Sequence, residues 1–132
     1  MNDYPFLFSL GSDTTVFTDT LTKKRRYVAH TPRNHESLFF VTKGTGLYER
    51  GAYREIIQEG QVGYISRGSV DISSAYDDRD FSYIAINFAF SKDNLTPTLP
   101  FHFICSPCGT YKYEELFQQA LNYFTSKTPG YL

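Results

Sequence analysis

Residues 33–87, RNHESLFFVTKGTGLYERGAYREIIQEGQVGYISRGSVDISSAYDDRDFSYIAIN, decide the fold. Short runs of apolar, β-branched and aromatic residues alternate in this stretch with turns built from glycine or acidic residues. The runs are 38–42, 47–50, 54–58, 62–66, 70–75 and 81–90. Strands that recur about every 8 to 12 residues are typical of an antiparallel sandwich or barrel, not of alternating strands and helices. The sequence therefore predicts a mainly β domain.

The segments on either side of this stretch are simpler. Pro5 confines residues 1–10 to an edge strand or an extended arm. Residues 19–26 are polar and basic, which indicates an exposed edge strand or loop, and 26–29 are expected to form a first barrel strand. Residues 113–125, YEELFQQALNYFT, carry apolar side chains at i, i+3 and i+4 spacing, so they predict an amphipathic helix.

These features divide the chain into three parts. We expect an N-terminal arm and first strand at 1–22, the β-barrel at 23–104, and a linker with the start of a helical region at 105–132. The chain stops at Leu132, shortly after the predicted helix ends, which indicates a piece of a longer protein.

Length and charge exclude several classes of function. At 132 residues the chain is expected to be one domain with its own core. A net charge of -1 gives no electrostatic footprint for nucleic acid. No run of apolar residues is long enough for a membrane span, and the first residues lack the features of a signal peptide. We expect a cytoplasmic protein with no membrane partner, in which Cys105 and Cys108 are reduced thiols.

Aromatic residues are unusually frequent. The sequence holds 11 Tyr and 12 Phe but no Trp. Such rings can fill a small barrel, and those with hydroxyl groups can also line a pocket. Alternation along strands separates the two uses, because successive side chains point to opposite faces. In 81–90 one face mixes rings with small and polar groups (Phe81, Tyr83, Ala85, Asn87) and suits a barrel interior, while the other is hydrophobic and suits packing from outside.

Two motifs then carry a resemblance to known families. Gly60-x5-Ser66-x-Gly68-x2-Asp71 resembles the second cupin motif, Gly-x5-Pro-x-Gly-x2-His. The Gly-Thr-Gly turn at 44–46, the segment EGQVGYIS and the strand FSYIAINF are, together with Arg33, similar to the amino-terminal effector-binding domain of AraC-family transcription regulators. The resemblance implies a cupin-type double-stranded β-barrel, or jelly roll, followed by a C-terminal α-helix.

The resemblance also implies a function. The expected domain senses a small-molecule effector, expected to be a sugar, and forms a homodimer through the C-terminal helix. It would control DNA binding by a helix-turn-helix domain that is absent from this chain, and it would be no enzyme. Two alternatives stay open: a metal-dependent cupin enzyme of the dioxygenase or isomerase type, and a dimerisation module whose barrel is filled by its own rings.

Departures from the cupin metal pattern favour the sensor. Metal-binding cupins use two His and a Glu from the first motif and a His from the second, because a divalent ion needs several such donors at one point. This chain has Ser37 in place of the Glu, Arg33 or Pro32 in place of the second His, and Asp71 in place of the last His, so only His30 matches. An arginine would repel a cation. We expect no metal and no cofactor.

The same strands supply the candidate binding residues. A buried arginine needs a partner, so Arg33 either contacts the ligand or forms a structural pair with Asp71. Alternation and the resemblance together nominate Arg33, His35, Ser37, Phe39, Asp71, Ser73, Tyr83, Ala85 and Asn87 as ligand-binding residues. His102, Cys105 and Cys108 have zinc-like spacing but no evident fourth ligand, so we assign them no site.

Overall fold

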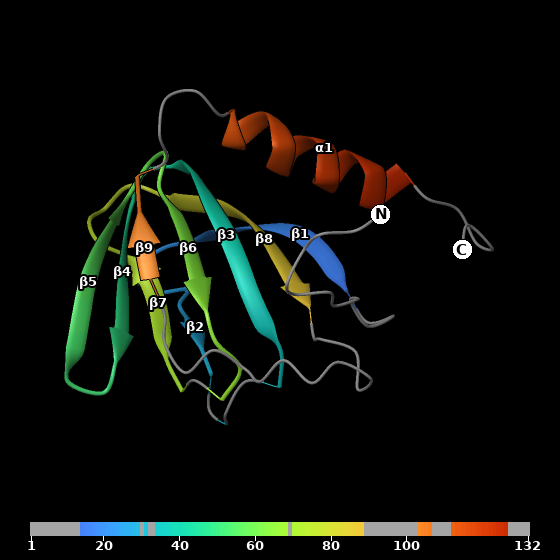
Figure 1. Cartoon of the computed structure of the whole chain (residues 1–132). Helices are drawn as coiled ribbons and strands as arrows, with labels where there is room; N and C mark the ends of the chain where they lie inside the picture. Colours follow the sequence, from blue (N-terminus) through green and yellow to red (C-terminus); the bar gives the residue numbers. More distant parts are fainter. Residues whose placement is uncertain are drawn as a thin grey trace.

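A computed structural model describes residues 14–29, 31, 34–68, 70–88, 103–106 and 112–126. Two antiparallel β-sheets face one another, and one helix lies across the outer face of the larger sheet (Figure 1). The elements are β1 (Thr15–Leu21), β2 (Tyr27–Val28), β3 (Glu36–Lys43), β4 (Thr45–Arg50), β5 (Tyr53–Gln58), β6 (Val62–Ile65), β7 (Ile72–Ala75), β8 (Phe81–Phe88), β9 (Phe103–Cys105) and α1 (Tyr113–Ser126). The prediction of a mainly β domain with a C-terminal helix is confirmed.

The order of the strands gives the barrel its double-layered form. The larger sheet has the order β1-β8-β3-β6-β9 and the smaller sheet the order β2-β7-β4-β5. The predicted strand runs correspond to β3 to β8, and the predicted run 26–29 contains β2. A strand within 1–22 was also predicted, and β1 occupies the second half of that range. Residues 1–10, whose pattern suggested it, lie outside the described residues.

β1 also takes in the start of the segment that we interpreted as a polar loop or edge strand, 19–26. It pairs with β8 along its whole length, from Thr15 opposite Asn87 to Leu21 opposite Phe81. Its polar residues are tolerated because β1 is an edge strand of the larger sheet: Thr18 and Thr20 are exposed while Val16 and Leu21 are buried. The side chains of Thr20 and Ser82 share a hydrogen bond of 2.9 Å.

Two hydrophobic cores use opposite faces of the larger sheet. Between the sheets lie Leu21, Phe39, Val41, Tyr48, Ile57, Ile65, Ala75, Phe81 and Ala85. Between the larger sheet and α1 lie Val16, Phe40, Val62, Ile84 and Phe117. The predicted alternation is therefore confirmed along β3 and β8, since Phe39 and Ala85 face the barrel interior while Phe40 and Ile84 face the helix. One sheet separates the two cores.

The chain passes from the larger sheet to the smaller one at Gly44, between β3 and β4. Gly44 has a φ of 79°, a left-handed conformation that favours glycine. A Cβ at this position would lie 2.1 Å from the carbonyl oxygen of Asp80. The predicted glycine turn is confirmed, and its first glycine is needed for both conformation and space.

α1 packs one face on the larger sheet and leaves the other face open. The prediction of a helix at 113–125 is confirmed, with the end at Ser126. Phe117 is buried, and its ring centroid lies 5.8 Å from that of Phe40. Leu116 and Tyr123 point away and are 55% and 63% exposed. Among the described residues, no helix combines the length and apolar character that a membrane crossing requires.

Candidate ligand-binding site

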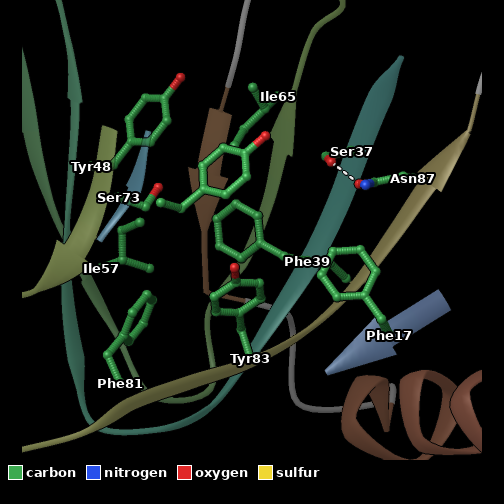
Figure 2. Close-up of a pocket in the computed structure, with 12 residues that line it drawn as sticks. Phe17, Ser37, Phe39, Tyr48, Ile57, Ile65, Ser73, Phe81, Tyr83 and Asn87 are labelled. Carbon is green, nitrogen blue, oxygen red and sulfur yellow. Dashed lines mark hydrogen bonds between the residues drawn. The ribbon is translucent and has the colours of Figure 1, made fainter. Parts of the chain in front are cut away.

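A cavity lies inside the barrel, between the two sheets (Figure 2). The centres of water molecules could occupy about 60 Å³ of this cavity. The lining comes from both sheets and comprises Phe17, Tyr27, Ser37, Phe39, Tyr48, Ile57, Ile65, Ser73, Phe81, Tyr83, Ala85 and Asn87. Since a single water needs roughly 10 to 15 Å³ in this measure, the cavity can hold several waters or one small molecule.

Aromatic rings form one continuous part of the wall. The rings of Phe39 and Tyr83 meet edge to face with centroids 6.5 Å apart, and those of Tyr83 and Phe81 are tilted with centroids 5.6 Å apart. The edge-to-face arrangement of Phe39 and Tyr83 is one that aromatic pairs prefer, and both pairs lie at centroid separations typical of aromatic contacts. The three rings come from neighbouring strands, β3 and β8, and Figure 2 shows them side by side with Ile57 close to Phe81. The wall therefore offers both ring faces and ring edges to a bound molecule.

One polar pair lies to the side of these rings. Ser37 on β3 and Asn87 on β8 are directly opposite in the strand register, and the Ser37 hydroxyl donates a hydrogen bond to Oδ1 of Asn87 (Figure 2). This bond occupies the amide oxygen and leaves the amide NH₂ group as a donor. None of the described residues that line the cavity carries a charged side chain. The site is thus suited to neutral groups that accept a hydrogen bond.

A second polar contact supports the wall from behind. Tyr48 lines the cavity and is 1% exposed, and its hydroxyl donates a hydrogen bond of 3.0 Å to Oδ2 of Asp71. Asp71 is 2% exposed and is not among the lining residues. A buried carboxylate with a donor in place stabilises the position of the ring that carries that donor. Asp71 therefore holds Tyr48 in the wall.

Six of the nine predicted binding residues line the cavity together: Ser37, Phe39, Ser73, Tyr83, Ala85 and Asn87. His35 and Asp71 do not line it. Arg33, with His30 and Pro32, lies outside the described residues. A ligand contact by any of the nine residues stays a prediction. For Arg33, both the ligand contact and the alternative pair with Asp71 stay predictions.

The other half of the lining residues had not been predicted as ligand-binding. Phe81 was placed in the barrel interior by alternation but not nominated, and Phe17, Tyr27, Tyr48, Ile57 and Ile65 were not considered. The available signal was alternation within each strand, which divides residues into two faces. Alternation alone does not say which face points inward, and no strand was predicted specifically at 15–21.

The positions that match cupin metal ligands have other partners here. Ser37 bonds to Asn87 and Asp71 accepts from Tyr48, as described above. Within the described part of the chain, no group of three or more His, Cys, Asp or Glu side chains could hold a metal ion. His102 and Cys108 fall outside the described residues, and Cys105 is described only as the last residue of β9. The suggested zinc spacing therefore stays untested.

A further polar pair lies on the opposite face of the larger sheet. Glu36 is 0% exposed, and neither of its carboxylate oxygens has a hydrogen bond in the described structure. Tyr64 lies close to it on β6; burial raises the pKa of the Tyr64 hydroxyl above its ordinary value of 10.0, and the negative charge of Glu36 adds to this rise. Because Glu36 and Ser37 are adjacent on β3, their side chains point to opposite faces. Glu36 is therefore not part of the cavity.

Similar solved structures identify the fold of the domain. No protein-family model and no curated protein matches the sequence. Two solved structures of ToxT from Vibrio cholerae are similar. One, bound to an unsaturated fatty acid, has a TM-score of 0.62 and 10% identity over 93% of this chain and 51% of that chain. The other, bound to (E)-4-(8-methylnaphthalen-1-yl)but-3-enoic acid, has a TM-score of 0.60 and 9% identity over 86% and 49%.

A cupin-like protein from Thermotoga maritima is also similar, with a TM-score of 0.51 and 21% identity over 66% of this chain and 63% of that chain. Together with the two facing antiparallel sheets, this similarity defines the chain as a cupin-type double-stranded β-barrel, as predicted. The chain spans about half the length of the ToxT structures, 51% and 49%.

Proposed function

We propose that this chain is the ligand-sensing domain of an AraC-type transcription regulator, in which DNA is bound by a part of the protein outside this chain. One observation carries the proposal: the barrel holds a partly open cavity lined by aromatic rings, aliphatic side chains and a few hydroxyl and amide groups, in a fold shared with ToxT, an AraC-family regulator. The two ToxT structures are bound to small molecules, an unsaturated fatty acid in one and (E)-4-(8-methylnaphthalen-1-yl)but-3-enoic acid in the other.

The layout of the sheet suggests how occupancy of the cavity could reach the rest of a regulator. Phe17 on β1 lines the cavity, and its neighbour Val16 packs in the core beneath α1. Phe39 and Phe40 on β3 are related in the same way. A ligand acts on an equilibrium only if it binds one arrangement better than another. We infer that a ligand pressing on Phe17 or Phe39 favours one position of α1 on the larger sheet.

Two finer parts of the proposal concern the ligand and the partner. A carbohydrate is the ligand that the sequence resemblance implies, and Tyr27, Ser37, Ser73, Tyr83 and Asn87 could each hydrogen-bond to a hydroxyl group. The predicted homodimer would use the open face of α1, where Leu116 and Tyr123 are exposed. Exposed apolar side chains in one region of a surface are typical of protein contacts.

We also propose that the domain is not a metal-dependent enzyme. In support, Ser37 and Asp71, at two positions where cupin enzymes have metal ligands, are engaged with Asn87 and Tyr48. Elemental analysis of the purified protein is expected to find no stoichiometric iron, manganese or zinc. A full equivalent of one of these metals, lost together with a measurable activity on chelation, would replace the sensor proposal by the enzyme alternative.

A fragment screen by thermal shift tests the sensor proposal directly. A molecule that binds only the folded chain raises its melting temperature by mass action. We expect hits whose binding is competed by one another and weakened by Ala85→Leu, which fills the cavity wall, but not by Lys24→Ala in an exposed loop. A library with no stabilising molecule would contradict the proposal and favour the dimerisation module.

A further inference from the structure

The shape of the cavity depends on a glycine beneath one of its rings. Gly63 on β6 is directly opposite Phe39 on β3. A Cβ on Gly63 would lie 2.1 Å from Cζ and 2.3 Å from Cε2 of Phe39, closer than real Cβ atoms approach other atoms. Gly63 does not have a positive φ, so its backbone conformation would admit another residue. Glycine is thus required there for space, because the ring of Phe39 lies flat over the neighbouring strand.

A second glycine has the same relation to a ring from the opposite sheet. A Cβ on Gly46 of β4 would lie 2.5 Å from Cζ of Phe81, which comes from β8. Phe81 therefore reaches across the barrel interior and rests on the backbone of the smaller sheet. Aromatic rings that cover a glycine in this way are a known means of filling the space above a strand without a side chain. Because the rings of Phe39 and Phe81 lie close to the strand backbones at Gly63 and Gly46, space between the two sheets stays open.

The surroundings of that space specify what can fill it. Apolar atoms of Phe39, Ile57, Ile65 and Phe81 make up much of the wall. Every hydroxyl of a buried ligand would need a hydrogen-bond partner, since a polar group buried without one costs binding free energy. A charged ligand would meet no opposite charge among the described residues of the wall. The largely apolar wall and the lack of charge among its described residues favour a neutral and mainly apolar molecule, whereas a sugar would depend on the few hydroxyl and amide groups of the lining.

One donor suited to such a molecule is the Asn87 amide. Its oxygen accepts from Ser37, so its NH₂ group is left to donate to a ligand. On the basis of the proposed sensing function, we propose that the cavity binds a neutral, single-ring aromatic molecule that carries a hydrogen-bond acceptor. The ring packs against Phe39 and Tyr83, the acceptor faces Asn87, and Gly63 keeps the space open by allowing Phe39 to lie flat.

Calorimetric titration of the 132-residue chain with three probes tests the ligand class. Benzamide has the ring and a carbonyl acceptor, butyramide has the acceptor without the ring, and D-glucose has many hydroxyls. We expect benzamide to bind roughly tenfold or more tightly than either of the other two. D-glucose binding at least as tightly as benzamide would overturn this inference and leave the sensor proposal intact. Failure of all three probes and of the wider fragment screen would overturn both.

Variants of the glycine test the structural part. We expect Gly63→Ala to weaken benzamide binding by about tenfold or more, because the added methyl group lifts Phe39 into the cavity. The double variant Gly63→Ala with Phe39→Leu removes the displaced ring and is expected to recover only part of the affinity, because it also removes the ring contact that Phe39 makes with the ligand. Benzamide affinity within about twofold of the parent in a folded Gly63→Ala chain would overturn the role of Gly63.

Gly63→Ala has a direct alternative if it does not fold. Ala85 is 4% exposed, lines the cavity and pairs with Phe39 from the other side, on β8. Ala85→Val narrows the same space without touching the glycine. We expect it to weaken benzamide binding while the circular dichroism spectrum of the chain stays unchanged; unchanged affinity in that variant would also overturn the inference.

Discussion

At the scale of single residues, the most informative contact is the one between Tyr48 and Asp71. Asp71 occupies the position where the cupin motif has its last histidine, and sequence analysis placed it among the ligand-binding residues. The structure has it buried behind the wall, accepting a hydrogen bond of 3.0 Å from Tyr48. A residue at a motif position that binds metal in other cupins can thus have a structural role, which here is to position a side chain that lines the cavity.

We predict that Asp71→Ala lowers the free energy of unfolding by about 1 to 3 kcal/mol, the usual result of leaving a buried polar group without its partner. Chemical denaturation monitored by tyrosine fluorescence measures this change. Asp71→Asn keeps an acceptor for Tyr48 and is expected to lose less. A double-variant cycle with Tyr48→Phe isolates the pair, and additive effects would show that Asp71 does not act through Tyr48.

Asp77 provides the matched control for this experiment. It is paired with Arg79 at 2.9 Å in an exposed loop, where ion pairs contribute little. The neighbouring Arg79 guanidinium holds the pKa of the Asp77 carboxyl below its ordinary value of 3.8. Even so, Asp77→Ala is expected to leave the unfolding midpoint unchanged at neutral pH, because the pair is open to solvent.

At the scale of elements, α1 shows how one sheet serves two cores. Its buried residue Phe117 contacts Phe40, whose neighbour Phe39 lines the cavity on the other face of β3. The helix therefore rests on the strand that carries the aromatic wall. Helices of this length are only marginally stable alone in water, so packing on the sheet supplies most of the stability of α1.

Truncation of Phe117 tests this dependence. Phe117→Ala is expected to lower the free energy of unfolding by about 3 to 5 kcal/mol, the usual cost of removing a buried aromatic ring. Gln118→Ala, at an exposed position of the same helix, is expected to change it by less than about 0.5 kcal/mol. Equal losses in the two variants would contradict the packing of α1 on the larger sheet.

At the scale of the whole molecule, α1 has an exposed outer face on the side away from the larger sheet. Leu116 and Tyr123 are about two helical turns apart and are both more than half exposed, at 55% and 63%. On the proposed function this face is where a second copy of the chain docks. The cavity on one side of the larger sheet and the docking face on the other would then be joined through β1 and β3.

We predict that the double variant Leu116→Ser with Tyr123→Ser weakens self-association by about tenfold or more without lowering the melting temperature of the monomer. Sedimentation velocity over a range of concentrations measures the effect. Ile56→Ser is the control, because Ile56 is 43% exposed on the edge strand β5. A chain that stays monomeric at all concentrations, or a dimer broken by Ile56→Ser alone, would contradict the prediction.

Much of the fold follows from the sequence by itself. Alternation along 38–42 and 81–90, the glycine turns and the helical spacing of 113–125 predicted the strands of residues 33–87, the helix and the two faces of β3 and β8. These are local properties, since side-chain direction along a strand and conformation at a glycine depend only on neighbouring residues. Half of the cavity lining therefore followed from these patterns together with the family resemblance.

Only the tertiary structure decided the other half. Phe17, Tyr48 and Ile57 come from three strands in two sheets, and their meeting depends on how distant strands pair and how the sheets face each other. The space under Phe39 likewise depends on Gly63, which lies 24 residues later in the chain (63 minus 39) and is opposite it only in the folded register. Strand register and sheet packing depend on contacts throughout the core. A local sequence pattern therefore cannot predict that a particular glycine shapes a binding site.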